Sequence, residues 1–257
     1  MGEAMRYGKL FGLLISVFML SGLAVSYFNV KKLHSSPMVI SRFSHFDIHS
    51  EFENAELLKE MDSVLEAAYL KSVDFFELEI GTTNVYVYEK QGTFQNKKYP
   101  ILSSFLDLSW YIGDNIGENV LIVSPAASVA GHTYESIMNA TGHEFVHTVV
   151  YRIAPKSNLW LNEGLALYLS NRNVDHFDLK GYSNIPDKDV WYTNNPVKFS
   201  NHGGYDFADK FVEYIVFKYG KDALLKMLVS DDFSDVLKIS DDTLFDEWVQ
   251  FLEDNYA

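Results

Sequence analysis

The hydrophobic pattern of the chain begins with one long apolar run. Residues 10–28, LFGLLISVFMLSGLAVSYF, carry no charged side chain and follow a short N-terminal flank, residues 1–9. At 1.5 Å per residue, a helix of this length just crosses the roughly 30 Å hydrocarbon core of a bilayer. Two interpretations stay open: a single-pass transmembrane anchor in the cell membrane, or a signal peptide that is cleaved so that the protein is secreted. Either one predicts that the remainder lies outside the cytoplasm.

The next stretch is polar and shows no periodicity. We predict a tether over residues 29–50 and a folded domain over residues 51–257. Inside that domain, apolar residues recur at helical spacing over residues 51–72 and predict an amphipathic helix. Two short runs of β-branched, aliphatic or aromatic residues, 85–88 and 119–124, predict strands.

The second half of the domain shows helical periodicity. Helices are predicted over residues 136–152, 159–170, 205–219, 223–229 and 243–252. Pro155 ends the first of these, Gly220 ends the third, and Ser240 begins the cap of the last. Because the strands precede most of the helices, we predict an α+β fold in which a small sheet-containing N-terminal lobe leads into a helical C-terminal lobe.

The amino-acid composition limits the kinds of functional site that this chain can form. The 257 residues carry a formal net charge of −14 and include no cysteine. Disulfides, thiolate zinc sites and cysteine nucleophiles are therefore excluded, and any bound metal must use His, Asp or Glu side chains. The acidic balance also argues against a nucleic-acid partner, because phosphate binding needs a basic surface.

One motif carries specific chemistry. The segment HEFVH, residues 143–147, matches the pattern HExxH and lies within a predicted helix. Positions i and i+4 share one face of a helix, so His143 and His147 can reach one metal ion while Glu144 projects beside them. We predict a two-histidine zinc site with Glu144 poised over a metal-bound water. The alternative is a solvated helix face with two ordinary histidines.

A catalytic zinc ion takes three protein ligands and keeps one open position, so a third ligand is needed. Glu163 stands 16 residues after His147, within the segment WLNEGLALYL. Pro155 separates two predicted helices, and an antiparallel helix pair would return Glu163 towards the histidines. A carboxylate in so apolar a stretch is costly unless it is paired or bound to a metal. The alternative is an exposed glutamate in the first turn of a helix.

Together the two segments resemble a known group of enzymes. HEFVH followed by WLNEGLALYL is similar to the gluzincin zinc metallopeptidases, in particular the peptidase MA-like domains related to M1 aminopeptidases. The resemblance implies a zincin-like metallopeptidase domain, one zinc ion held by His143, His147 and Glu163, and Glu144 as general base. It extends to the segment YDFADKFV, where the match to a family tyrosine implies that Tyr205 stabilises the tetrahedral oxyanion.

The chain also departs from that group. M1 aminopeptidases bind the substrate's free amine through a G-x-M-E-N segment, whereas the corresponding stretch here, residues 123–131, contains no acid. Exopeptidase specificity is therefore unsupported, and we expect an endopeptidase. A metzincin site is excluded because Val150 and Ile153 occupy the glycine and third histidine positions of that motif.

Other residues are weaker candidates for the site. His202 is an alternative oxyanion donor, and Asn162 either supports a metal ligand or caps a helix. His132 and His176 are candidate neighbours. An extended substrate is expected to add as a further strand beside residues 119–124.

The expected reaction is hydrolysis of peptide bonds in a peptide or protein substrate. Zinc would lower the pKa of a bound water, and Glu144 would accept its proton. Two alternatives stay open. One is a catalytically silent zincin domain that binds a peptide or an envelope partner, and the other is a zinc hydrolase that acts on a non-peptide bond.

Overall fold

The structure is a computed structural model that describes residues 33–34, 37–99, 108, 110–170, 177–230 and 232–257. The hydrophobic segment predicted to be an anchor or signal peptide lies outside these residues. Among the helices that are described, none is long and apolar enough to cross a membrane.

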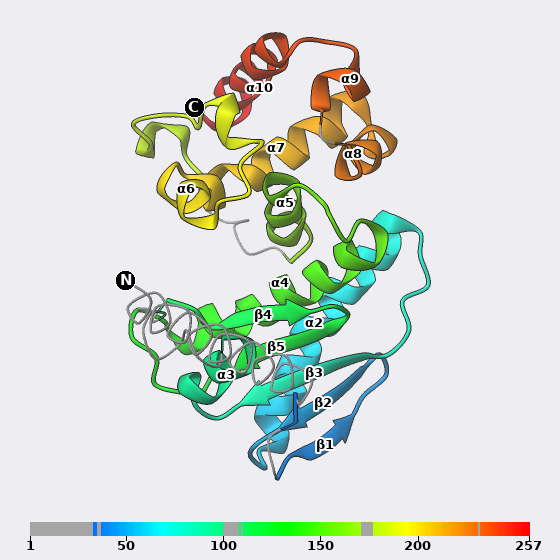
Figure 1. Ribbon diagram of the computed structural model, residues 1–257, viewed down its shortest axis with the longest axis vertical. Coiled ribbons are helices and arrows are strands. Elements are labelled where there is room, and N and C mark those ends of the chain that lie inside the picture. Colours follow the sequence, from blue (N-terminus) through cyan, green and yellow to red (C-terminus); the bar gives the residue numbers. More distant parts are fainter. Residues whose placement is uncertain (1–32, 35–36, 100–107, 109, 171–176, 231) are drawn as a thin grey trace, which may run out of the picture.

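The described part of the chain contains a five-stranded mixed sheet (Figure 1). Its strands are β1 (Val39–Arg42), β2 (Phe46–Ser50), β3 (Thr83–Tyr88), β4 (Gly113–Ile116) and β5 (Asn119–Val123), in the spatial order β1-β2-β3-β5-β4. The three central strands run parallel to one another, and β1 and β4 pair antiparallel at the two edges. A parallel pair needs a crossover connection, which α2 (Ala55–Phe76) supplies between β2 and β3.

Alternation of side chains along β3 gives the sheet two apolar faces. Val85 and Val87 belong to the main core, which the helices α2 and α4 (Tyr134–Ile153) also line. Tyr86 and Tyr88 belong to a second, smaller core, which α3 (Gln91–Lys98) covers with the fully buried Phe94. The sheet is therefore buried on both faces, as expected for parallel strands.

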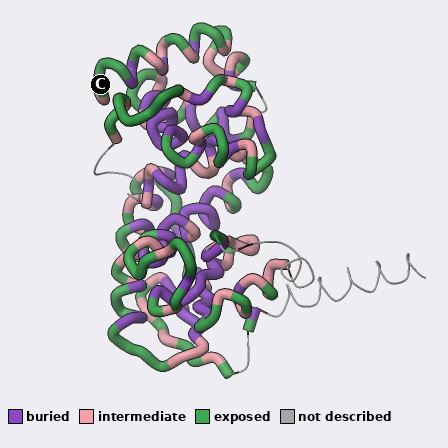
Figure 2. Tube along the Cα trace, turned by 90° about the vertical axis from the view of Figure 1, so that its left-hand side faces the viewer, coloured by how far each residue is buried: buried purple, intermediate pink, exposed green. Residues whose placement is uncertain are grey.

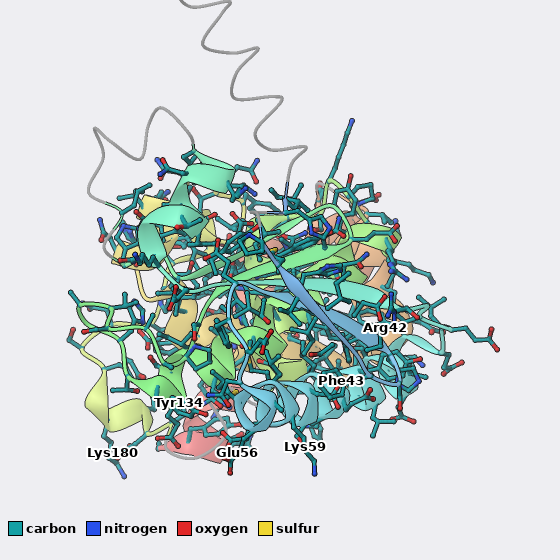
Figure 3. All side chains as sticks on the ribbon, turned by 90° about the horizontal axis from the view of Figure 1, so that it is seen from below. Arg42, Phe43, Glu56, Lys59, Tyr134 and Lys180 are labelled. Carbon is teal, nitrogen blue, oxygen red and sulfur yellow. The ribbon has the colours of Figure 1, made fainter. Side chains whose placement is uncertain are left out.

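The start and end of α4 are fixed by local contacts. The Thr133 side chain accepts a hydrogen bond from the backbone N–H of Ser136, and Ser136 caps the backbone of Thr133 in return. The hydroxyl of Tyr134 donates to Glu60 of α2. Figure 3 shows Tyr134 on the same side of the molecule as Glu56, one turn earlier on α2. The helix ends at Ile153, before Pro155.

A second helix, α5 (Leu159–Ser170), joins the sheet-bearing half to the C-terminal helices (Figure 1). It packs against α4 on one side and against α7 (Gly204–Tyr219) on the other. The remaining C-terminal elements are η2 (Leu179–Gly181), η3 (Lys188–Val190), α6 (Pro196–Asn201), α8 (Lys221–Leu228), α9 (Phe233–Leu237) and α10 (Asp241–Tyr256). Buried residues run through both halves in Figure 2, and one apolar cluster connects them.

The predicted mixture of a small sheet and a helical C-terminal lobe is confirmed. All the helices and both strands expected from the sequence are present, with ends shifted by a few residues. The tether predicted over residues 29–50 is wrong for residues 39–50, which form β1 and β2. β2 carries two apolar residues, Phe46 and Ile48, and both are fully buried because they alternate with polar residues on a strand.

Candidate metal centre

The two histidines of the HExxH segment lie on one face of α4 and point to the same place. Their Nε2 atoms are 3.0 Å apart, and both residues are buried, with 3% of His143 and 7% of His147 exposed. Two uncharged imidazoles at this separation direct two lone pairs into one small volume, which favours a shared metal ion.

Glu163 completes the group from α5. Its carboxylate oxygens lie 3.3 Å from Nε2 of His143 and 3.6 Å from Nε2 of His147. Zinc bonded to nitrogen and oxygen at about 2.0–2.2 Å in a tetrahedron separates its ligand atoms by about 3.3–3.6 Å. The two distances to Glu163 fall in that range, and the 3.0 Å between the imidazoles is slightly shorter. Within the described part of the chain, these three are the acidic and histidine side chains that lie close enough together to hold one metal ion.

Asn162 supports His147 from the other side of its ring. Oδ1 of Asn162 lies 3.0 Å from Nδ1 of His147. A carbonyl oxygen only accepts hydrogen bonds, so Nδ1 carries a proton, and in the neutral ring Nε2 then has the lone pair that a metal needs. The role of helix cap, the alternative for Asn162, belongs instead to Asn158, whose Oδ1 lies 3.3 Å from the backbone nitrogen of Leu161.

The electrostatic environment favours a cation at this position. Burial, the largest influence, lowers the pKa of His147, but the carboxylates of Glu163 and Glu144 raise it. The hydrogen bond to Asn162 and the charge of Asp114 act in the same direction, and the net pKa is raised. A proton is held tightly where negative charge surrounds a buried ring, and the same charge would hold a divalent metal.

The three residues line a cleft of about 490 Å³. Most of its lining comes from four parts of the chain: the segment around β4, the helix α4, the helix α5, and the start of α7. The lining residues are Tyr99, Trp110, Tyr111, Ile112, Gly113, Asp114, Asn115, His132, Ala140, His143, Glu144, His147, Asn162, Glu163, Leu167, Pro196, Tyr205 and Asp206. Glu144 therefore shares the cleft with the three candidate ligands.

The strand β4 forms one wall of the cleft and was not predicted from the sequence. Asp114 on this strand pairs with Lys98 at 2.9 Å and accepts a hydrogen bond from the hydroxyl of Tyr111. Burial and the charge of Asp114 raise the pKa of Tyr111, which keeps this hydroxyl protonated as a donor. The available signal was the short connection Gly117-Glu118 before β5, because a two-residue turn with glycine is typical of a hairpin.

The structure also changes where an extended substrate can pair. β5 was expected to offer a free edge, but β3 and β4 pair with it on its two sides. The strand at this edge of the sheet is β4, which lines the cleft with Gly113, Asp114 and Asn115.

The structure separates the weaker candidates for the site. Tyr205 lines the cleft, is 37% exposed, and meets the ring of Phe199 edge-on at 4.9 Å. His132 also lines the cleft, and its Nε2 lies 3.0 Å from the backbone oxygen of Trp110. His202 is exposed outside the cleft lining, with Nδ1 2.8 Å from the backbone oxygen of Lys198. His176 lies outside the described residues.

Comparison with known proteins adds no assignment to this site. The chain matched no family model, and it matched no curated protein. The case for a metal centre therefore depends on the donor set, its spacing and its surroundings.

Proposed function

We propose that this chain is a zinc-dependent peptidase with a zincin-like fold of the gluzincin type. The observation that carries the proposal is the convergence of His143, His147 and Glu163 in one cleft that also contains Glu144. Two imidazoles and one carboxylate are the donors that catalytic zinc uses in hydrolases, and this set leaves one coordination position open.

Each residue of the proposed site has a separate task. His143, His147 and Glu163 hold the ion, and Asn162 fixes the ring of His147. A zinc ion bound there supplies an acidified water and polarises the carbonyl of the substrate. Glu144 accepts the proton of the attacking water and then donates it to the leaving amine of the peptide.

Tyr205 is the proposed hydrogen-bond donor to the oxyanion. It lines the same cleft and is partly exposed, which supports contact between its side chain and a bound substrate. A single donor of this kind contributes about 3–4 kcal/mol to the stability of a tetrahedral transition state.

The proposed substrate is an internal segment of a peptide or an unfolded protein. β4 ends the sheet at the cleft, and an extended chain can pair with the outer edge of such a strand. Among the described residues that line the cleft, lysine and arginine are absent, so no cationic side chain there selects a free terminal carboxylate. This favours an endopeptidase over a carboxypeptidase.

The proposed location is outside the cytoplasm. Residues 10–28 would anchor the chain in the cell membrane, or would direct its secretion if they are cleaved. We propose that the catalytic domain acts on substrates at or beyond the membrane surface.

The full chain, purified in detergent, tests this function on a panel of unfolded proteins. Cleavage of internal peptide bonds should stop with a zinc chelator and return when zinc is restored. If the chain binds one zinc ion but cleaves no member of the panel, the peptidase proposal fails. A panel of esters and other non-peptide substrates would then separate a different hydrolase from a silent binding domain.

A further inference from the structure

We infer that Gly113 of β4 is the residue that positions Glu144, because only glycine leaves room for this carboxylate beside the sheet. The inference extends the proposed function, in which Glu144 is the general base. It assigns Gly113 a role in positioning a catalytic group, and the role depends on the missing side chain.

The space at Gly113 is already occupied by Glu144. A Cβ atom built on Gly113 would lie 2.8 Å from Cγ and 2.9 Å from Oε1 of Glu144, and 2.8 Å from Cδ1 of Ile122. Carbon atoms in contact prefer about 3.5–4.0 Å, so alanine at this position would collide with both side chains. Glu144 thus packs directly against the backbone of the strand that borders the cleft.

Backbone conformation does not explain this glycine. Within the described part of the chain, the glycines that adopt positive φ are Gly117, Gly131, Gly203 and Gly220, and Gly113 is not among them. Any residue can adopt the extended conformation of Gly113, so the requirement for glycine here is one of space.

The strand has little freedom to move away from Glu144. Gly113 pairs with Ile122 in the register of β4 and β5, and the backbone N–H of Val123 donates to the carbonyl of Ile112 at 2.9 Å. Lys98 also holds the next two residues of β4. It pairs with Asp114 at 2.9 Å and donates to the backbone oxygen of Asn115 at 3.1 Å.

The flexible partner in the collision is therefore the Glu144 side chain. Its backbone belongs to the middle of α4, which the core fixes, so an added methyl group would turn the carboxylate away from its place. The three atoms nearest to this methyl position belong to Glu144 and Ile122, and none belongs to a proposed zinc ligand. A substitution at Gly113 should thus impair the base while leaving metal binding intact.

A stability cycle tests the contact without any enzyme assay. All variants carry Ile122→Val, which removes Cδ1 and hence the second collision. In this background, Gly113→Ala should lower the melting temperature by several degrees when Glu144 is present. When Glu144→Ala is also present, the same substitution should have no effect or raise the melting temperature, because alanine is favoured over glycine in a strand. Equal losses in both backgrounds would overturn the inference.

Turnover and zinc content test whether a substitution at Gly113 impairs the base and leaves metal binding intact. Gly113→Ala in the Ile122→Val background should retain one zinc ion and lower kcat about 100-fold with little change in KM, as expected when a catalytic group is misplaced. In a Glu144→Gln background, it should cause no further loss. Gly81→Ala is the matched control, because a Cβ there meets nothing within 4 Å. An unchanged kcat in Gly113→Ala would contradict the assigned role.

These two measurements also separate this inference from the proposed function. If the wild-type chain cleaves no peptide, the peptidase proposal fails, and the stability cycle alone decides whether Gly113 sets the position of Glu144.

Discussion

Asn162 and His147 form a hydrogen bond at the ring nitrogen opposite the one that faces Glu163. The amide oxygen lies 3.0 Å from Nδ1, and this contact holds the ring in the tautomer that a metal requires. Because Asn162 directly precedes Glu163 on α5, one turn of helix provides both a proposed ligand and the support of another.

Asn162→Ala should therefore weaken zinc binding. Loss of such a supporting contact typically reduces metal affinity by about 10–100-fold. Competition with a chromophoric chelator measures this affinity. Asn158→Ala is the matched control, since Asn158 caps α5 and donates to the backbone oxygen of Trp191; its loss should cost about 1–3 kcal/mol of stability without changing the affinity. If Asn162→Ala binds zinc as tightly as the wild type, the supporting role is wrong.

Glu144→Gln should keep the metal and abolish most of the activity. The amide has nearly the same shape as the carboxylate but cannot accept a proton from water, so we expect kcat to fall by two to four orders of magnitude, roughly the contribution of a general base. Zinc analysis and turnover measured on one preparation check both parts. Activity near that of the wild type would remove Glu144 from the mechanism.

Tyr205→Phe tests the oxyanion donor. The substitution keeps the edge-on contact between the ring and Phe199 but removes the hydroxyl. We expect kcat and kcat/KM to fall equally, by about 10²–10³, with KM and zinc content little changed. A variant with full kcat would show that the hydroxyl has no part in catalysis.

The sequence was sufficient to predict that His143, His147 and Glu163 lie close together, but not which residues form the walls of the cleft. The spacing of His143 and His147 is a local property of one helix, and Pro155 made the return of Glu163 on a second helix predictable. β4 depends instead on pairing with β5, and its residues, GDNI, show no apolar alternation that would mark a strand.

Two further features depend on tertiary contacts that a sequence pattern does not contain. The tether prediction failed at β2 because only Phe46 and Ile48 are apolar there, and parallel pairing with β3 determines that they are buried. The closeness of Gly113 to Glu144 joins residues on a strand and a helix, so neither segment alone reveals it.

The buried carboxyl group of Asp209 makes the free energy of unfolding depend on pH. Only 4% of this residue is exposed, and burial raises its pKa to about 6, although Lys210 opposes the shift. The ordinary value is 3.8, so between about pH 4 and 6 the folded state holds a proton that the unfolded chain releases. The free energy of unfolding therefore falls as the pH rises through this window, and the loss is complete above the folded pKa.

Asp209→Asn should remove this loss. The variant should gain up to about 3 kcal/mol over the wild type at pH 8 and little at pH 4, since one pKa unit corresponds to about 1.4 kcal/mol. Urea unfolding at the two pH values measures the difference. If the gain in stability of Asp209→Asn over the wild type were smaller at pH 8 than at pH 4, the assignment would be contradicted.

The zinc content of the full chain and of Glu163→Ala tests the central claim most directly. Elemental analysis after dialysis should find one zinc ion per wild-type chain. It should find far less in Glu163→Ala, because one of three protein ligands is gone. The control Glu253→Ala, an exposed position on α10, should keep the full amount. A wild-type chain without zinc, or a Glu163→Ala variant with full occupancy, would contradict a metal centre formed by His143, His147 and Glu163.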